Sequence, residues 1–286
     1  MTDDRPVLPS SAVESAPVSS VPIIGLDRVS KTYPGQAGST EALQDVSLAI
    51  ERGEFVSLIG PSGCGKSTLL RIVGDLVPPS AGTVTVNGKS PQEARLSRDY
   101  GIVFQAPVLY DWRTVEANVR LPLEVMGSLR GERDERVRAL LRLVGLDAFR
   151  RHFPWQLSGG MQQRVAIARA LVANPAILLM DEPFGALDEM TRERLNLELL
   201  SICVETAATV LFVTHSIAEA VFLSSRVVVL SPRPGRVERV VDVDLPRPRT
   251  EKTRALPRFF ELVTTVREHL VEDPALAAGG RAREGA

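Results

Sequence analysis

The apolar positions of the chain follow two patterns that take turns along the sequence. Short, nearly continuous apolar runs are typical of buried strands, and they occur at 55–59, 177–180, 209–213 and 226–230. Apolar residues at helical spacing predict an amphipathic helix over 133–144 that ends at Gly145. Strands that alternate with helical patterns predict an α/β fold whose mainly parallel sheet is covered on both faces.

The N-terminal part has a different pattern, in which apolar and polar residues alternate. This alternation predicts strands near 23–29 and 46–50, with a turn at Pro34–Gly35 after the first. A further strand is expected at 83–86, followed by a turn at Asn87–Gly88. These strands lie ahead of the run of strands and helices that predicts the parallel core.

Composition sets the domain limits and excludes some functions. Residues 1–20, rich in Ser, Pro, Ala and Val, predict a disordered leader, and 21–245 a folded domain with a mainly helical insertion at about 106–160. The C-terminal extension, 246–286, contains one expected helix near 259–270 and an end that frays from about 274. A net charge of −1 argues against nucleic acid as the main partner. Two cysteines suit a reducing compartment, and every apolar run is too short to cross a bilayer.

The clearest chemical signal is a glycine-rich loop between an apolar strand and a helical stretch. Residues 60–67 fit the phosphate-loop pattern G-x-x-x-x-G-K-[ST], which predicts binding of ATP with Mg²⁺. Lys66 is expected to reach the β- and γ-phosphates and Ser67 to ligate Mg²⁺. Cys64 is either a redox-sensitive thiol or a small loop residue, and the lack of a second thiol nearby favours the latter. The expected nucleotide-binding residues of this loop are Gly60, Pro61, Ser62, Gly63, Cys64, Gly65, Lys66, Ser67 and Thr68.

Two adjacent carboxylates end the strand at 177–180. In a parallel sheet this end faces the same crevice as the phosphate loop. Asp181 is therefore expected to bind nucleotide through Mg²⁺, and Glu182 to polarise the water that attacks the γ-phosphate.

Further motifs resemble those of ABC ATPases over roughly residues 22–245. Residues 157–164, L-S-G-G-M-Q-Q-R, resemble the signature motif of that family, and they lie between the phosphate loop and the acidic strand end as in the family. Taken singly, Tyr33 could be a turn aromatic, Gln105 a surface amide and His215 a hydrogen-bonded histidine. The resemblance instead implies that Tyr33 stacks on adenine, that Gln105 is the Q-loop residue at the nucleotide and metal, and that His215 is the catalytic switch histidine. It also identifies 186–188 as the D-loop.

The resemblance implies a fold and a mechanism. The fold is a P-loop NTPase core, RecA-like and mainly parallel, with an N-terminal antiparallel β part and an inserted helical subdomain. Two copies would meet head to tail around two Mg-ATP, with catalysis by Glu182, His215 and Gln105. The residues expected to act on the nucleotide of the partner copy are Ser158, Gly159, Gly160, Gln163 and Asp188.

The resemblance also implies partners. The segments that look like the nitrate, sulfonate and taurine group of bacterial importers are 104–115, 118–119, 121–124, 184–188 and 231–236. Other members of that group carry bicarbonate or aromatic and pyrimidine-type compounds. Tyr110–Asp111 replaces the commoner Leu-Pro, which favours solutes other than taurine and nitrate. Such a subunit would be peripheral, on the cytoplasmic face of the inner membrane, bound to a separate permease and indirectly to a periplasmic or lipid-anchored solute-binding protein.

Other ATPase classes fit the sequence less well. A DNA-repair or chromosome-structure ATPase would carry a coiled-coil or zinc-bearing insertion, and a tandem translation factor would carry two motif sets. A kinase or GTPase would lack the signature motif that begins at 157–160. Tyr110 and Trp112 leave two interpretations open: a docking surface for the permease, or the core of the helical subdomain.

Overall fold

The computed structural model describes residues 21–35, 38–127 and 130–271. The leader expected at 1–20 and the end expected to fray from about 274 lie outside the described residues. The strands are β1 (Ile24–Gly35), β2 (Gly38–Ile50), β3 (Phe55–Ile59), β4 (Ala81–Val86), β5 (Tyr100–Val103), β6 (Ile177–Asp181), β7 (Thr209–Val213), β8 (Arg226–Leu230) and β9 (Val237–Asp242). The α-helices are α1 (Lys66–Val73), α2 (Pro91–Ser97), α3 (Val115–Val125), α4 (Arg130–Leu143), α5 (Gly159–Leu171), α6 (Glu189–Thr206), α7 (Ile217–Leu223) and α8 (Pro257–Val271).

The larger sheet has the strand order β5-β6-β7-β3-β8-β9. The first five strands are parallel, as the alternation of strands and helices predicts, and β9 pairs antiparallel with β8 at the edge. The apolar runs therefore lie in the centre of a sheet that is covered on both faces, and β3, β6 and β7 are buried along their whole length.

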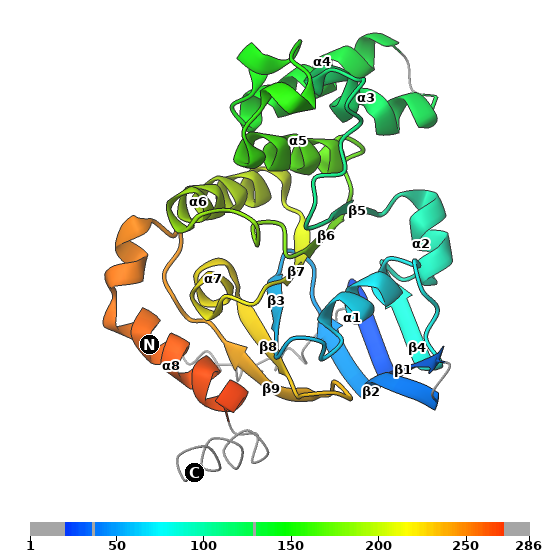
Figure 1. The fold of residues 1–286 in the computed structure, drawn as a ribbon, viewed down its shortest axis with the longest axis vertical. Coiled ribbons are helices and arrows are strands. Elements are labelled where there is room, and N and C mark those ends of the chain that lie inside the picture. Colours follow the sequence, from blue (N-terminus) through cyan, green and yellow to red (C-terminus); the bar gives the residue numbers. More distant parts are fainter. Residues whose placement is uncertain (1–20, 36–37, 128–129, 272–286) are drawn as a thin grey trace, which may run out of the picture.

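A smaller antiparallel sheet, of order β2-β1-β4, lies beside the larger one together with α1 and α2 (Figure 1). The turn expected at Pro34–Gly35 is wrong in its position, because β1 continues through Gly35, which pairs with Gly38. The Asn87–Gly88 turn lies where the sequence predicts it, directly after β4.

The larger sheet separates two hydrophobic cores. Successive residues of β7 show this, since Val210 and Phe212 pack into one core while Leu211 and Val213 pack into the other. One core lies under α1 and the smaller sheet, and the other lies under α5 to α8. Burying apolar side chains on both faces stabilises the fold by about 25 cal/mol per Å² of apolar surface and fixes the strand ends in space.

Three helices, α3, α4 and α5, form a group at one end of the molecule (Figure 1). The helix predicted over 133–144 is α4, and Gly145 follows it with a φ of 67°, a left-handed conformation that favours glycine after a helix. The helical range of about 106–160 contains α3 and α4, while α5 continues past it. The bounds of the helical insertion, about 106–160, stay a prediction.

The helix expected near 259–270 is α8, and three of its side chains, Phe259, Leu262 and Val266, are buried in the core beneath α7. Three elements were not expected from the sequence: β5, β9 and α2. The edge strand β9 has only one buried residue, Val241, so it lacks the apolar run of a central strand. Among the described residues, no helix is long and apolar enough to cross a membrane.

Candidate active site

The carboxyl ends of four neighbouring strands bring the predicted site residues together. The phosphate loop follows β3, Asp181 ends β6 and Glu182 follows it, His215 follows β7, and Gln105 follows β5. Since β5, β6, β7 and β3 are adjacent and parallel, all four segments open on one edge of the sheet.

Steric constraints shape the phosphate loop between β3 and α1. Gly65, with a φ of 104°, directly precedes α1, and a Cβ there would lie 2.8 Å from the carbonyl oxygen of Ala42. The buried Lys66 ammonium donates hydrogen bonds to the carbonyl oxygens of Gly60, at 2.8 Å, and Pro61, at 3.0 Å. The amino end of α1 and this cation make the loop suited to phosphate oxygens.

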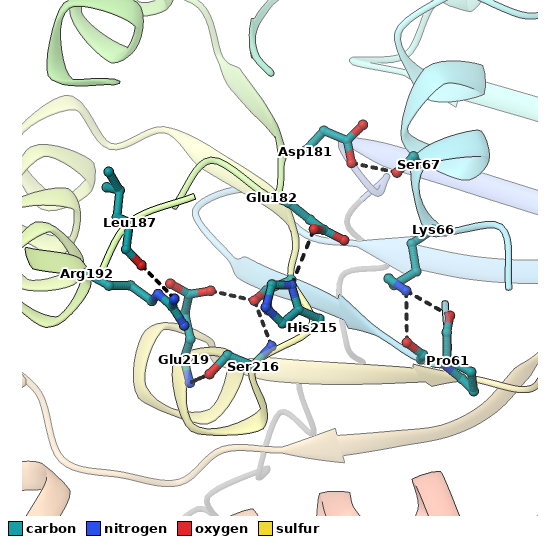
Figure 2. Close-up of polar contacts among 12 residues, drawn as sticks. Pro61, Lys66, Ser67, Asp181, Glu182, Leu187, Arg192, His215, Ser216 and Glu219 are labelled. Atoms are coloured by element: carbon teal, nitrogen blue, oxygen red, sulfur yellow. Dashed lines mark hydrogen bonds and ion pairs between the residues drawn. The ribbon is translucent and has the colours of Figure 1, made fainter. Parts of the chain in front are cut away.

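A hydroxyl and a carboxylate meet across the sheet edge beside this loop. Ser67 Oγ donates to Asp181 Oδ1 at 2.7 Å, although the two residues come from α1 and β6 (Figure 2). Both are hard oxygen ligands of the kind that Mg²⁺ prefers, and two protein oxygens leave room for phosphate and water ligands. The residues present therefore fit the metal predicted from the sequence.

Glu182 contacts the histidine that follows the next strand. His215 Nδ1 lies 3.3 Å from Glu182 Oε2, and the His215 side chain is 55% exposed (Figure 2). Glu182 has a φ of 47°, a strained conformation for a non-glycine residue, which costs on the order of 1–3 kcal/mol. Its backbone N–H donates to the Val213 carbonyl oxygen at 2.9 Å, which holds the carboxylate at the end of the sheet.

Gln105 is exposed and lies close to the same carboxylate. A Cβ built on Gly185 would lie 3.4 Å from Gln105 Nε2 and 3.6 Å from Glu182 Oε2. Gly185 thus leaves room beside both the Gln105 amide and the Glu182 carboxylate.

A single cavity of about 450 Å³ joins most of these residues. Tyr33, on β1, lines it together with the phosphate loop, so an aromatic ring and the phosphate site share one pocket. Lys31 Nζ lies 5.0 Å from the centroid of the Tyr33 ring. The residues that line the cavity are Tyr33, Thr40, Ala42, Ser62, Gly63, Gly65, Lys66, Ser67, Thr68, Glu182, His215 and Arg233.

The signature residues lie outside this cavity. Ser158 is the exposed N-cap of α5 and accepts a hydrogen bond from the Met161 N–H at 3.4 Å. Gly159 is exposed too. Gly160 is buried, and a Cβ built on it would lie 3.1 Å from Thr191 Cγ2. The chain therefore presents a helix amino end on its surface, outside its own nucleotide cavity.

Two other residues assigned to the partner's nucleotide have contacts within their own chain. Gln163 is buried, and its Nε2 donates to the Phe104 carbonyl oxygen at 3.3 Å, so this side chain joins α5 to the residue before Gln105. The role of Gln163 at the nucleotide of the partner copy stays a prediction. Asp188 is exposed and caps α6, and the hydrogen bond from the Thr191 N–H lowers the pKa of its carboxyl.

A buried carboxylate behind the histidine was not expected from the sequence. Glu219, on α7, accepts a hydrogen bond from Thr214 Oγ1 at 2.5 Å, and burial raises its pKa. Arg192 faces it from α6 and donates to the Leu187 carbonyl oxygen at 2.8 Å (Figure 2). Glu219 thus bonds to the residue before His215, and Arg192, whose charge lowers the pKa of Glu219, bonds to the segment 186–188. In the sequence, Glu219 is an acidic residue in the first turn of a helix, and nothing in the pattern indicates that it is buried.

These features define a class of protein. A strand, a glycine-rich turn and a helix with Lys66 and Ser67, facing Asp181 on a neighbouring strand, are those of a P-loop nucleotide hydrolase. The attached antiparallel sheet and the helix that begins at Ser158 match the further parts implied by the sequence.

Comparisons with known proteins give the family. The chain matches the ABC transporter family over residues 43–185. It is 47% identical to the taurine import ATP-binding protein TauB of Rhizobium johnstonii, over 90% of this chain and 100% of the relative. It is 43% identical to the nitrate import ATP-binding protein NrtD of Synechocystis, over 82% and 89% of the two chains. The dimeric structure of a bacterial ABC transporter cassette aligns with a TM-score of 0.69 and 41% identity, covering 77% of this chain and 98% of that one.

The chain belongs to the ABC transporter family, and it is an ATP-binding subunit with ATPase activity. The fold class and the family predicted from the sequence motifs are thereby confirmed.

Proposed function

We propose that this chain drives import of a small solute through a separate permease, as a peripheral subunit on the cytoplasmic face of the membrane. The observation that carries the proposal is the convergence of the phosphate loop, Asp181, Glu182 and His215 at one sheet edge. Relatives at 40–47% identity are named as ATP-binding proteins for import of taurine, aliphatic sulfonates and nitrate.

The hydrolytic step uses the charges at this edge. Glu182 orients a water molecule and accepts its proton as the oxygen attacks the γ-phosphorus, while the bond to the β-γ bridging oxygen breaks and ADP leaves. His215, in contact with Glu182, positions the carboxylate. Lys66 compensates negative charge on the β- and γ-phosphates. Tyr33 stacks on the adenine from β1.

Ser67, Asp181 and Gln105 would hold Mg²⁺, as the motifs predict. When bound, the metal supplies positive charge to the β- and γ-phosphate oxygens. The Ser67–Asp181 contact of 2.7 Å already brings these two protein ligands together.

The second half of each site comes from a second copy of the chain. Ser158 and the amino end of α5 lie on the surface outside the cavity, so a helix terminus suited to an anion is not part of the nucleotide cavity of the same chain. A head-to-tail dimer would bring the signature residues and the D-loop of one copy to the nucleotide held by the other: Ser158, Gly159, Gly160, Gln163 and Asp188. ATP then joins the subunits and hydrolysis releases them.

Mixed dimers test this arrangement. With Lys66→Ala in one copy and Ser158→Arg in the other, both lesions fall on one composite site, and the second site retains activity. With both substitutions in one copy, each composite site is damaged and activity falls to background. The measurement is ATP hydrolysis by purified mixed dimers. Both arrangements contain the same two substitutions, so equal activities would rule out the head-to-tail dimer.

The surface of the helical part offers a docking site for the permease. Trp112 is 75% exposed and Tyr110 is 40% exposed, with their ring centroids 5.0 Å apart, so the interpretation of these residues as subdomain core is wrong. The buried Asn118 side chain bonds the backbone of Tyr110 at both N–H and carbonyl, at 2.8 and 3.1 Å. Exposed aromatic rings on a fixed backbone suit contact with a short partner helix.

Replacing Tyr110 and Trp112 by alanine tests the docking site. We expect ATP affinity and thermal stability of the isolated subunit to stay near wild type, because both rings are exposed, and permease association to fall at least tenfold, as for removal of interface aromatics. Pull-down with the permease and transport in vesicles are the measurements. The matched control is Phe260→Ala, which removes an exposed aromatic ring on α8. Normal transport by the double variant would place the docking site elsewhere.

The identity of the solute belongs to the permease and to the solute-binding protein that we propose as an indirect partner. The candidates are nitrate, sulfonate or taurine-type anions and aromatic or pyrimidine-type compounds. Affinity purification of the full chain from native membranes should recover a permease, and a ligand screen of the associated binding protein would give the solute. Recovery of DNA or ribosomes without a permease would contradict the transport function.

A further inference from the structure

The turn at residues 231–236, after β8, closes against the phosphate loop. Gly235 is fixed to β2 by two backbone hydrogen bonds, from its own N–H to the Ala42 carbonyl oxygen and from the Gln44 N–H to its carbonyl oxygen, both 3.0 Å. A Cβ at Gly235 would overlap the carbonyl oxygen of Cys64 in the phosphate loop. The turn therefore lies in direct contact with the loop, and only glycine permits this approach.

Arg233 extends from this turn to the nucleotide cavity. Its Nε and Nη2 both donate to the carbonyl oxygen of Gly63 at 3.2 Å, and its side chain lines the cavity together with Lys66 and Tyr33. Arg236, on the same turn, donates instead to Gln44 Oε1 and does not line the cavity. Arg233 therefore faces the nucleotide cavity, whereas Arg236 bonds to β2.

The charge of Arg233 has no carboxylate partner in residues 21–35, 38–127 and 130–271. A guanidinium has five N–H donors, and two of them share a single carbonyl oxygen here. Free donors and an uncompensated positive charge beside a phosphate loop favour a polyanionic ligand.

We infer that Arg233 is a nucleotide-binding residue, which adds positive charge at the triphosphate and holds Gly63 of the phosphate loop in place. It comes from the turn after β8 and so lies outside the nucleotide motifs described above. This inference rests on the proposed role of the phosphate loop, and it deepens that role.

Nucleotide titrations of the isolated full-length subunit test the inference. Calorimetry with ATP, ADP and AMP, in EDTA to prevent hydrolysis, compares wild type with Arg233→Gln and Arg233→Lys. The glutamine keeps a donor for the Gly63 carbonyl but removes the charge, whereas the lysine keeps the charge. We expect Arg233→Gln to weaken ATP binding about fivefold, ADP binding less and AMP binding hardly at all. Arg233→Lys should retain most of the ATP affinity, and Arg236→Gln should match wild type.

Salt dependence gives a second measurement. Raising the ionic strength should weaken ATP binding more in wild type than in Arg233→Gln, because one ionic contact is missing from the variant. An equal loss for ATP, ADP and AMP would show that Arg233 only supports the loop and would overturn the inference. Unchanged affinities for all three nucleotides would overturn it as well.

Lys66→Ala distinguishes this inference from the proposed function. If Lys66→Ala loses ATP affinity while Arg233→Gln does not, only the role of Arg233 fails. If Lys66→Ala binds ATP like wild type, the proposed role of the phosphate loop fails first.

Discussion

Replacing Glu182 by glutamine is expected to stop ATP turnover while leaving ATP binding intact. The amide has nearly the shape of the carboxylate but cannot accept the proton of the attacking water, so the rate should fall by about 10²–10⁴-fold, the usual contribution of a general base. Because hydrolysis normally separates the two copies, the ATP-bound dimer should accumulate. Phosphate release measures the first effect, and light scattering coupled to gel filtration measures the second.

The control for this prediction is Glu205→Gln, which removes an exposed carboxylate at the far end of α6. It should hydrolyse ATP at the wild-type rate and should not trap a dimer. Turnover near the wild-type rate in Glu182→Gln would show that another group activates the water. His215, at 3.3 Å from the carboxylate, would then be the first candidate.

Replacing Lys66 by alanine is expected to weaken ATP binding by about tenfold to a hundredfold and to abolish hydrolysis. The ammonium is buried beside the loop carbonyls of Gly60 and Pro61, so its loss removes a positive charge that water does not supply. A hydrogen bond to a charged group contributes about 1.5–3 kcal/mol, and 1.4 kcal/mol corresponds to a factor of ten. Calorimetric titration with ATP measures the affinity, and a coupled assay the rate.

Two further variants define the role of Lys66. Lys89→Ala removes a lysine whose ammonium pairs with Asp99 outside the nucleotide cavity, so it should bind and hydrolyse ATP normally. Ser67→Ala should reduce the gain in affinity that Mg²⁺ gives more than the affinity for metal-free ATP, because its hydroxyl faces Asp181. Identical profiles for Lys66→Ala and Ser67→Ala would contradict their separate roles.

Elements built from neighbouring residues could be predicted well. The phosphate loop is a strand, a turn and a helix in one continuous segment, so its glycines, Lys66 and Ser67 are readable in order along the chain. The helix α2 was missed although its signal is local: Ser90 and Glu93 form a capping box around Pro91. Its short length and single buried residue, Ala94, left no apolar pattern to indicate a helix.

The surroundings of the site depended on contacts between distant segments. The sequence does not show that Gln163 turns inward to Phe104, because burial of one amide depends on how α5 packs against the loop after β5. Glu219 likewise has a raised pKa only because the fold buries it, and that burial outweighs the opposite effects of Thr214 and Arg192. Exposure of Trp112 was equally undecided, since an aromatic ring fits a core and a docking surface alike.

The sequence by itself determined the family, the order of the strands and helices that carry the motifs, and the chemistry at each strand end. These follow from local rules, in which backbone geometry and side-chain type act over a few consecutive residues. The tertiary structure alone decided that Arg233 reaches Gly63 across 170 residues of chain, and that the surface of α5 lies outside the cavity. Such contacts arise when strands far apart in sequence become neighbours in the sheet, as β3 and β8 do, and this pairing follows from the packing of the whole core.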